Sequence, residues 1–463
     1  MEADKPTRTE ALMEVVRMRI ANRSLSPGDR LPSIRDFARD MKASPSTVAE
    51  AYARLEAEGV LRARRGAGFY VTGVDLPPMA LAEMGEPREQ SVDPFWVSRL
   101  SLDARASDLM PGCGWLPASW MPNGAIRKGL RAMSRGEAAL LTDYGSTRGA
   151  LELRRLLIGR FAEEGLPATA SQLMLTGSGT QAIDLICRLL LRPGDTVLLD
   201  DPCYFNFQAL LRAHQVRMVS VPFTPDGPDV ELFGQIVAAE KPRLYITNSA
   251  LHNPTGASLS PQTAYRVLSA AAAHGMTIVE DDIFADFEPA LSPRLAVLDG
   301  LSRVIRIGSF SKILSASIRC GYIAARQDWI DGLTDLQIAT SFSGPSPVAV
   351  SIITGILTGG SYRRHMDDIR QRLTTAREET ASRLASLGLV PWVIPRGGFY
   401  LWCRLPEGLT SSDVARRCMQ ERVILAPGNV FSVTQSAGPF LRFNVAHMAD
   451  NRIYAALEKA MKA

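Results

Sequence analysis

The side chain with the most distinctive chemistry in this 463-residue chain is Lys312, which ends the segment Gly308-Ser309-Phe310-Ser311-Lys312. Two serine hydroxyls precede the amine, and Arg319 follows it seven residues later. An amine whose pKa is lowered by its surroundings can form a Schiff base with a carbonyl compound. Hydroxyls and a guanidinium are groups that bind phosphate. The segment therefore predicts a reactive amine beside a phosphate-binding site.

Four other short segments carry complementary groups. Gly177-Ser178-Gly179-Thr180 precedes a predicted helix, where backbone amides favour a phosphate. Asp201-Pro202-Cys203-Tyr204 supplies an aromatic ring, and Asn253-Pro254-Thr255-Gly256 is a polar turn. Glu280-Asp281-Asp282 ends an apolar run with carboxylates, which are costly to bury without a cation. Each segment alone is common, so the evidence lies in their combination.

These segments follow short β-rich runs that alternate with helical segments from Tyr144 onward. Such alternation predicts an α/β fold with a mainly parallel sheet and helices on both faces. Ligands of these sheets bind beyond the carboxyl ends of the strands, where the polar segments lie. The predicted strands are 173–176, 196–199, 216–219, 243–247, 276–280, 304–308 and 320–324.

A pyridoxal-phosphate site needs this set of groups. It requires a Schiff-base lysine, and a carboxylate that keeps the pyridine nitrogen protonated. A donor to the ring oxygen, a stacking aromatic side chain and a phosphate cup complete it. The presence of all these groups at strand ends, in this order, predicts pyridoxal 5'-phosphate as cofactor.

From Tyr144 to its end the chain resembles a fold-type I aminotransferase, which adds a smaller C-terminal α+β subdomain. The resemblance implies that Lys312 holds the cofactor as an aldimine, while Asp282 faces the pyridine nitrogen, with the adjacent Asp281 as the alternative. It implies that Asn253 bonds the ring oxygen and that Tyr204 stacks on the ring. The implied phosphate ligands are Gly179, Thr180, Ser309, Ser311 and Arg319.

The resemblance extends to three further positions. Leu441-Arg442-Phe443-Asn444 resembles the family segment whose arginine binds a substrate α-carboxylate, which implies this role for Arg442. Tyr144 resembles a tyrosine that reaches the phosphate of the partner subunit, which implies a homodimer. Phe284 departs from the family, because many relatives carry a tyrosine there that bonds the ring oxygen. The missing hydroxyl should raise the pKa of the internal aldimine and weighs against efficient transamination.

The first 74 residues have a different character. Residues 11–21 are predicted to form a helix, Ser33 begins a second in a capping-box spacing, and Ser44 with Pro45 begins a third that ends near Gly59. Residues 60–71 are predicted to form two strands joined by a glycine-rich, arginine-flanked tip. The stretch 17–65 holds 11 Lys or Arg against 6 Asp or Glu, whereas the whole chain carries a net charge of only +4.

This stretch resembles the winged helix-turn-helix of GntR-type regulators, which bind double-stranded operator DNA. The resemblance implies DNA contacts by Arg35, Ser46, Thr47, Arg64 and Gly66. Pro45 stands where these proteins usually carry an arginine, so base specificity at that point should differ.

Length and composition predict the organisation of the chain. It is too long for one ordinary core. The predicted parts are residues 1–74, the DNA-binding domain; 75–108, a linker; and 109–463, the aminotransferase-like effector domain. The six cysteines are scattered without a CxxC pair, no metal site is expected, and no apolar run nears the roughly 20 residues of a membrane span. The protein is therefore predicted to be cytoplasmic.

The combination of a GntR-type domain and an aminotransferase-like domain resembles the MocR subfamily of bacterial regulators. The resemblance implies a homodimer, often head-to-tail. The primary hypothesis is a pyridoxal-phosphate-dependent transcriptional regulator that senses an amino compound by forming an external aldimine. Two alternatives stay open: an active aminotransferase that retains a DNA-binding domain, and a regulator that senses free pyridoxal phosphate.

Overall fold

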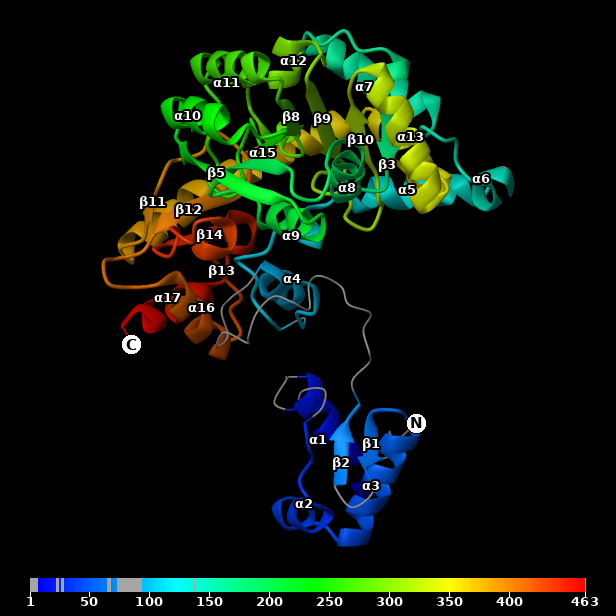
Figure 1. Ribbon diagram of the computed structural model, residues 1–463, viewed down its shortest axis with the longest axis vertical. Coiled ribbons are helices and arrows are strands. Elements are labelled where there is room, and N and C mark those ends of the chain that lie inside the picture. The colour runs from blue at the N-terminus through cyan, green and yellow to red at the C-terminus, as the bar shows by residue number, and fades with distance from the viewer. Residues whose placement is uncertain are drawn as a thin grey trace. The chain divides into compact units, whose positions relative to one another are not determined.

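The computed structural model describes residues 7–21, 25, 29–64, 68–72, 94–105, 107–136 and 138–462. The chain divides into two compact units, Met1–Glu86 and Pro87–Ala463 (Figure 1). No helix within these described ranges is long and apolar enough to cross a membrane. The division separates the residues predicted to bind DNA from those predicted to bind phosphate.

The described residues of the smaller unit form three helices and a two-stranded antiparallel hairpin. As predicted, Ser33 and Ser44 cap the second and third helices: their hydroxyls accept hydrogen bonds from the amides of Asp36 (3.2 Å) and Thr47 (3.1 Å). These bonds satisfy amides that have no partner inside a helix. The elements are α1 (Arg8–Ala21), α2 (Ile34–Asp40), α3 (Pro45–Ala57), β1 (Leu61–Arg64) and β2 (Gly68–Val71).

One face of α3 forms the core of this unit. Val48, Ala51, Tyr52 and Leu55 have no exposed surface, as their helical spacing predicts. They pack in one cluster with apolar side chains of α1, α2, β1 and β2. Burial of this face leaves the polar side of α3 exposed.

An eight-stranded sheet forms the centre of the larger unit (Figure 1). Its order is β3-β10-β9-β8-β7-β4-β5-β6. The strands from β9 to β5 are parallel, whereas β10 is antiparallel to both its neighbours and β6 is antiparallel to β5. All seven predicted strands are present. The bounds are β3 (Leu173–Thr176), β4 (Thr196–Asp201), β5 (Arg217–Thr224), β6 (Gly227–Pro228), β7 (Leu244–Thr247), β8 (Thr277–Asp281), β9 (Val304–Ser309) and β10 (Gly321–Ala324).

Helices cover both faces of this sheet, as predicted. Alternate strand residues face opposite sides, so Leu198 joins one buried apolar cluster while Val197 and Leu199 join the other. The cluster of Val197 and Leu199 holds side chains of α8 (Gly179–Leu190), α9 (Phe205–Ala213) and α13 (Gln327–Ser341). The cluster of Leu198 holds side chains of α7 (Leu151–Glu163), α10 (Val230–Glu240), α11 (Pro261–His274), α12 (Leu295–Asp299), α14 (Pro347–Thr358) and α15 (Ser361–Ser386).

A second sheet forms the smaller C-terminal subdomain. Four antiparallel strands run in the order β11-β12-β14-β13. Their bounds are β11 (Val390–Pro391), β12 (Tyr400–Arg404), β13 (Ala426–Pro427) and β14 (Phe440–Asn444). The remaining α-helices are α5 (Asn123–Met133), α6 (Ala138–Thr142), α16 (Ser411–Gln420) and α17 (Asn451–Lys462), and the short 3-10 helices are 118–120, 170–172, 285–287, 428–431 and 445–447.

Part of the segment expected to be a linker is a helix. Helix α4 (Pro94–Leu102) belongs to the larger unit, although residues 75–108 were expected to connect two domains. Val97 is 2% exposed and packs with Phe205 and Phe431. This contact explains the difference, because a nine-residue helix gains its stability mainly from tertiary packing, which weak sequence periodicity does not reveal.

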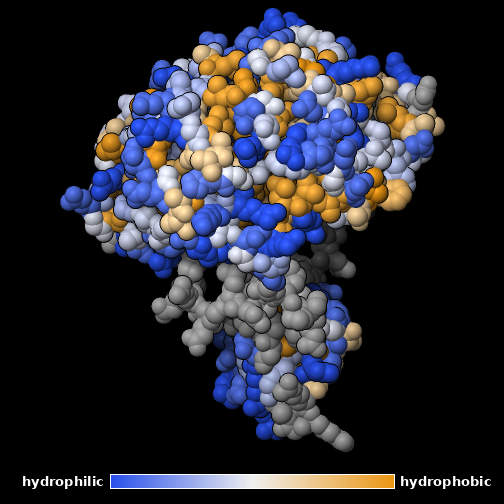
Figure 2. All heavy atoms as spheres, turned by 45° about the horizontal axis from the view of Figure 1, so that its top comes forward, coloured by the Kyte–Doolittle hydropathy of each residue, from blue (hydrophilic) through white to orange (hydrophobic). Residues whose placement is uncertain are grey.

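The surface of the larger unit mixes hydrophilic and hydrophobic patches (Figure 2). Among the exposed apolar side chains are Leu141, Tyr144 and Phe342. By contrast, all six cysteines are buried and none forms a disulfide.

Candidate functional site

A cavity of about 250 Å³ lies at the carboxyl ends of the sheet strands in the larger unit. The residues that line it come from the segments that follow β3, β4, β7 and β9, from the end of β8, and from the second sheet. Nine predicted site residues meet there although they span more than 260 positions of the chain. They are Gly179, Thr180, Tyr204, Asn253, Ser309, Ser311, Lys312, Arg319 and Arg442.

Lys312 supplies the reactive amine of the cavity. Its Nζ donates a hydrogen bond to the carbonyl oxygen of Gly114 at 2.6 Å. Burial, helped by the nearby Arg442 and Arg319 guanidiniums, lowers the pKa of this amine to about 8. A larger fraction of the amine is therefore neutral and nucleophilic at neutral pH than for an exposed lysine.

The two adjacent carboxylates have different environments, and the placement expected for Asp282 is wrong. Asp281 lines the cavity, whereas Asp282 does not. The Asp282 carboxylate lies 2.7 Å from Arg294 Nε and 2.5 Å from Arg306 Nη2, and all three side chains are at most 3% exposed. Neighbouring residues of an extended strand point to opposite faces, so only one of the pair can face the cavity.

Asp281 is the buried carboxyl of the cavity. Burial raises its pKa to about 7, against the partial opposing effect of hydrogen bonds from the Ile283 amide and the Asn248 side chain. The Ile283 amide lies 3.2 Å from Asp281 Oδ1. A cation placed beside this group would lower its pKa again. The arrangement therefore suits a protonated ring nitrogen.

The predicted phosphate ligands form a cradle at the start of α8. Ser178 caps this helix and accepts a hydrogen bond from the Gln181 amide at 3.0 Å. Ser309 Oγ donates to Ser311 Oγ at 3.0 Å on the facing segment. A side chain at Gly321 would have its Cβ 2.9 Å from the Ser178 carbonyl carbon, so only glycine fits there. Amides, hydroxyls and Arg319 thus surround a space suited to a dianion.

Arg442 and Asn253 are joined at another wall of the cavity. Arg442 is 1% exposed, and its Nη1 donates to Asn253 Oδ1 at 2.8 Å while its Nη2 donates to the Gly112 carbonyl at 2.8 Å. Its Nε has no hydrogen-bond partner within the structure. The guanidinium lies over the rings of Tyr400 and Phe431, 4.2 and 4.7 Å from their centroids. A buried arginine with an unpaired donor is suited to a carboxylate ligand.

Of the two tyrosines predicted for the site, one lines the cavity and the other does not. Tyr204 follows β4 and lines the cavity, with its ring 5.0 Å from that of Phe205. Tyr144 does not line the cavity; it is 75% exposed, and its ring lies 4.7 Å from that of Phe342.

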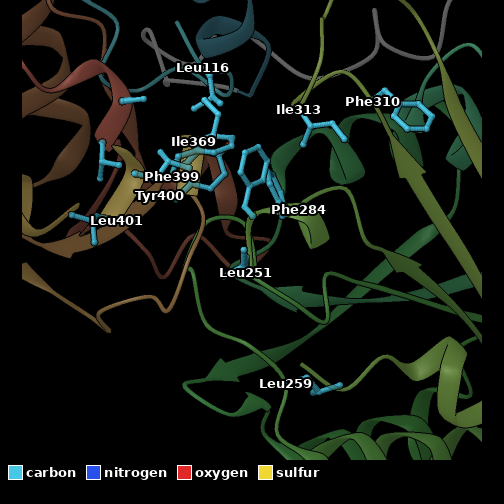
Figure 3. Close-up of a cluster of buried hydrophobic side chains, with 14 of the residues drawn as sticks. Leu116, Leu251, Leu259, Phe284, Phe310, Ile313, Ile369, Phe399, Tyr400 and Leu401 are labelled. Atoms are coloured by element: carbon cyan, nitrogen blue, oxygen red, sulfur yellow. The ribbon is translucent and has the colours of Figure 1, made fainter. Parts of the chain in front are cut away.

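Sequence analysis missed several residues of this cavity. Tyr400 and Phe284 line it, and their ring centroids are 5.6 Å apart; Figure 3 shows both within one buried cluster with Phe399. A Cβ at Gly114 would lie 3.4 Å from Tyr400 Oη and 3.9 Å from Lys312 Nζ. Helix α4 also lines the cavity. The position of Phe284 was singled out from the sequence, whereas Tyr400, Gly114 and helix α4 stand in no recognisable motif, so no sequence signal identified them.

The candidate DNA-contacting residues lie on the smaller unit. Arg35 on α2 and Ser46 at the start of α3 are exposed, and Thr47 is half-buried. The Ser44 hydroxyl lies 2.8 Å from Ser46 Oγ and 2.7 Å from Thr47 Oγ1. Of the predicted residues of the β-hairpin, Gly66 and the side chain of Arg64 lie outside the described residues.

Comparison with known families assigns both units. Residues 119–459 match the family described as Aminotransferase class I and II. Residues 8–71 match Bacterial regulatory proteins, gntR family. The residues between these matches, which include α4, belong to neither.

Whole-chain relatives share both parts. YdfD, an uncharacterized HTH-type transcriptional regulator of Bacillus subtilis, is 25% identical over 97% of this chain and 93% of its own. YdcR, an uncharacterized HTH-type transcriptional regulator of Escherichia coli, is 26% identical over 94% of each chain. The HTH-type transcriptional regulator NorG of Staphylococcus aureus is 23% identical over 93% of this chain and 98% of its own.

Solved structures agree on the fold of the larger unit. LysN, the α-aminoadipate aminotransferase of Thermus thermophilus, is 23% identical, with a TM-score of 0.73 over 79% of this chain and 94% of its own. The kynurenine aminotransferase of Pyrococcus horikoshii is also 23% identical, with a TM-score of 0.73 over 83% of this chain and 96% of its own.

Proposed function

Since the chain belongs to the aminotransferase class I and II family and joins that domain to a gntR-family helix-turn-helix domain, we propose that it is a DNA-binding transcriptional regulator. Its signal is an amino compound that binds in the cavity of the larger unit. One observation carries this proposal: the same chain holds two kinds of site. The smaller unit has exposed groups suited to DNA, and the larger unit has a buried lysine beside a carboxyl and a phosphate cradle.

The cavity fits pyridoxal 5'-phosphate, on which this aminotransferase family depends. Lys312 would attach the cofactor, and Asp281 would pair with its pyridine nitrogen. The start of α8 would hold the phosphate, together with Ser309, Ser311 and Arg319. When bound, the cofactor supplies a carbonyl carbon that captures primary amines and a ring that withdraws electrons.

Arg442 orients the amino compound. Arg442 lines the cavity and its Nε has no hydrogen-bond partner, and among the described residues Asp281 is the one carboxyl that lines the same cavity. An incoming carboxylate would gain a charge-assisted hydrogen bond there. The effector is therefore an amino acid or a related compound with both an amine and a carboxylate. LysN offers a parallel, because its structure contains N-(5'-phosphopyridoxyl)-L-leucine.

The protein acts as a homodimer in the cytoplasm. The rings of Tyr144 and Phe342 are in contact at an interplanar angle of 58° although the two residues are 75% and 64% exposed, and Leu141 nearby in the chain is 55% exposed. Exposed apolar patches of this kind mark interaction surfaces. Docking of a second copy would cover them and bring Tyr144 to the partner's phosphate cradle.

An active aminotransferase is the second candidate, since Lys312, Asp281 and Arg442 meet in one cavity as turnover requires. Phe284, which lacks the hydroxyl of many relatives, weighs against it. Turnover with 2-oxoglutarate, without any change in DNA affinity, would favour this candidate. A regulator that senses free pyridoxal phosphate would change its DNA affinity when the cofactor alone is added.

The testing experiment is an absorbance spectrum of the full-length protein with added cofactor, before and after a panel of amino compounds. The visible band of covalently attached cofactor should appear, should be absent in Lys312→Ala, and should remain in the control Lys462→Ala, which changes an exposed side chain of the C-terminal helix. A compound that shifts the band should also change the affinity for DNA. No band after added cofactor would overturn the sensing proposal, whereas a shifted band with unchanged DNA affinity would overturn regulation alone.

A further inference from the structure

Two adjacent aspartates, Asp200 and Asp201, end strand β4, and neither of them lines the cavity. Neighbouring residues of a strand point to opposite faces of the sheet, so the two carboxylates enter different surroundings. Asp200 has no exposed surface, and Asp201 is half-buried. Their contacts connect the end of β4 to two walls of the site around Arg442.

Asp200 is the centre of a buried polar network. Its Oδ1 accepts a hydrogen bond from Tyr245 Oη at 2.5 Å, and its Oδ2 accepts one from Thr247 Oγ1 at 2.7 Å. His252 Nε2 lies 3.4 Å from the same Oδ2, and the Asp200 and His252 side chains are each 1% exposed. A buried carboxylate is costly unless donors of this kind surround it. The network therefore ties β4 and β7 to the turn that begins at His252.

His252 carries this support to Asn253, the next residue. The His252 ring stacks on the ring of Phe223 with a centroid distance of 3.8 Å, so contacts on its face and at its edge fix its position. Asn253 Oδ1 accepts the hydrogen bond from Arg442 Nη1 at 2.8 Å. Asp200 thus supports the amide wall of the arginine site.

Asp201 connects β4 to the C-terminal subdomain. Its Oδ2 accepts hydrogen bonds from the Thr434 amide at 3.0 Å and from Thr434 Oγ1 at 2.6 Å. Two residues farther along the chain, the Cys203 amide donates to the Phe431 carbonyl oxygen at 2.8 Å. These bonds hold the loop of Phe431 against the end of β4. Because the Arg442 guanidinium lies 4.7 Å from the centroid of the Phe431 ring, Asp201 supports the aromatic wall of the same site.

Arg442 is therefore held between an amide and an aromatic ring whose positions both depend on the end of β4. Immobilising a long side chain opposes binding, and an arginine that the fold already holds avoids most of that cost. Its charge-assisted bond to a carboxylate then contributes fully to affinity. If one wall were loose, a ligand with a carboxylate would bind more weakly, while the binding of an amine without a carboxylate would not change.

We propose that Asp200 and Asp201 are positioning residues for Arg442, and that the two carboxylates together set the preference of the cavity for ligands that carry a carboxylate. Neither lines the cavity, so both act through other residues. Asp200 acts through the turn at Asn253, and Asp201 acts through the loop of Phe431. This inference rests on the function proposed above, in which an amino compound with a carboxylate binds beside Arg442.

The measured quantity is the carboxylate preference of the full-length, cofactor-loaded protein. It is the apparent dissociation constant of an amine divided by that of the amino acid with the same side chain. The probe pairs are ethylamine and L-alanine, 3-methylbutylamine and L-leucine, and 2-phenylethylamine and L-phenylalanine. A shift of the visible cofactor band reports the binding of either member. Arg442→Ala defines the preference that remains without the guanidinium.

The support by Asp201 is tested at Thr434. Thr434→Val removes one of the two donors to Asp201 and keeps the shape of the side chain. It should lower the carboxylate preference by about fivefold, because one hydrogen bond of the support is lost. Thr434→Ser keeps the hydroxyl and should keep the preference of the parent. The matched control is Thr358→Val, which removes another exposed threonine hydroxyl, one that donates to the Thr354 carbonyl oxygen at 2.8 Å. It should leave the preference unchanged.

The support by Asp200 is tested at Tyr245. Tyr245→Phe removes the Oη donor and should also lower the carboxylate preference by about fivefold. Tyr454→Phe, at a buried tyrosine of α17 that does not line the cavity, is the matched control. Thr247→Val removes the other donor to Asp200 and tests the same support if Tyr245→Phe does not fold. If the two supports act independently, Tyr245→Phe combined with Thr434→Val should lower the preference by about 25-fold.

The outcomes separate this inference from the proposed function. An unchanged preference in Thr434→Val and Tyr245→Phe, beside a parent preference that Arg442→Ala abolishes, would overturn the inference and leave the proposed function intact. Equal weakening of both members of a probe pair would show that the carboxylates only stabilise the fold, and would also overturn it. A loss in one variant alone would overturn the role of the other carboxylate. A parent that binds both members of every pair equally well, or neither, would overturn the role of Arg442 in the proposed function, and this inference with it.

Discussion

The larger unit holds a buried group of charges that differs from the exposed ion pairs of the smaller unit. In the smaller unit, the pairs Arg17–Glu58, Arg39–Asp36 and Arg54–Glu50 have side chains that are 43–75% exposed. In the larger unit, Asp282 lies between Arg294 and Arg306, and these three side chains are at most 3% exposed.

This difference separates charges that are free to bind a ligand from charges that stabilise the fold. Exposed pairs contribute about 0–1 kcal/mol to stability and are screened by salt, so their arginines can exchange partners with a phosphate backbone. A buried pair that loses one member leaves an uncompensated charge, which costs about 3–5 kcal/mol. The buried group around Asp282 therefore fixes the strand end from which Asp281 reaches the cavity.

The largest expected effect comes from substituting the two adjacent carboxylates, Asp281 and Asp282, one at a time. Asp282→Asn should lower the free energy of unfolding by about 3 kcal/mol, because Arg294 and Arg306 lose their shared partner and keep only Glu288 and Glu164. Asp281→Asn should not destabilise the protein but should weaken cofactor binding by about tenfold or more, since a charge-assisted hydrogen bond is lost. Denaturant unfolding and cofactor titration measure the two effects. Equal losses of stability in both variants would contradict the placement of Asp281 in the cavity.

The second effect is a pH dependence of stability in the cofactor-free protein. The pKa of Asp281 rises from 3.8 to about 7 in the folded state. Between these values the folded state binds more protons than the unfolded chain, so the free energy of unfolding falls as pH rises. Asp281→Asn removes this decline, and its stability relative to the parent should therefore increase up to about pH 7 and then level off.

For Lys312 the change of the free energy of unfolding with pH has the opposite sign, so this residue serves as the internal comparison. Burial lowers its pKa from 10.5 to about 8. Above about pH 8 the unfolded chain holds the proton that the folded state has lost, so stability rises toward the ordinary pKa of lysine. Denaturant titrations across this range should show that Lys312→Ala removes the rise. For the preceding prediction, a difference in the free energy of unfolding between the parent and Asp281→Asn that is the same at all pH values would contradict the raised pKa of Asp281.

A smaller effect is expected for the exposed charges of the smaller unit. Arg35→Ala should reduce DNA affinity and lower the slope of log affinity against log salt by about one, because one phosphate contact is lost. Its stability should stay unchanged, since Arg35 is exposed. Fluorescence anisotropy at several salt concentrations measures both quantities. Arg452→Ala, which removes the same charge from an exposed position near the C-terminus, should leave DNA binding unaltered.

The smallest effect concerns a helix cap. Ser44→Ala removes the acceptor of the Thr47 amide and should destabilise the smaller unit by about 1 kcal/mol. The start of α3 should then fray, and DNA affinity should fall with it. Ser46→Ala, which removes no cap, should affect DNA affinity without that loss of stability. Thermal unfolding of the two variants distinguishes a structural hydroxyl from a DNA-contacting one.

Much of this architecture follows from local sequence. The caps at Ser33 and Ser44, the buried face of α3 and seven strands of the large sheet appear where their residues predict them. Each depends on residues within a few positions of one another. The carboxyl ends of parallel strands meet at one edge, so the lysine, the phosphate-binding hydroxyls and Arg319 were predictable as neighbours.

Other features depend on contacts that local sequence does not encode. Asp281 and Asp282 are the same residue type in adjacent positions, and only the surrounding arginines and the direction of the strand end decide which one faces the cavity. Helix α4 forms where Val97 meets Phe205 and Phe431, which are distant in the sequence. Tyr400 enters the cavity from the second sheet.

The sequence by itself thus predicted both kinds of site in this protein, the DNA-binding groups and the lysine with its phosphate-binding groups. It could do so because helix caps, strand patterns and the Lys312 segment are short-range signals. Only the tertiary structure decided which carboxyl lies with Lys312, and that α4 lines the cavity. The physical reason is that burial and charge pairing depend on side chains brought together from remote parts of the chain. A residue's own type and neighbours cannot specify the environment that sets its pKa.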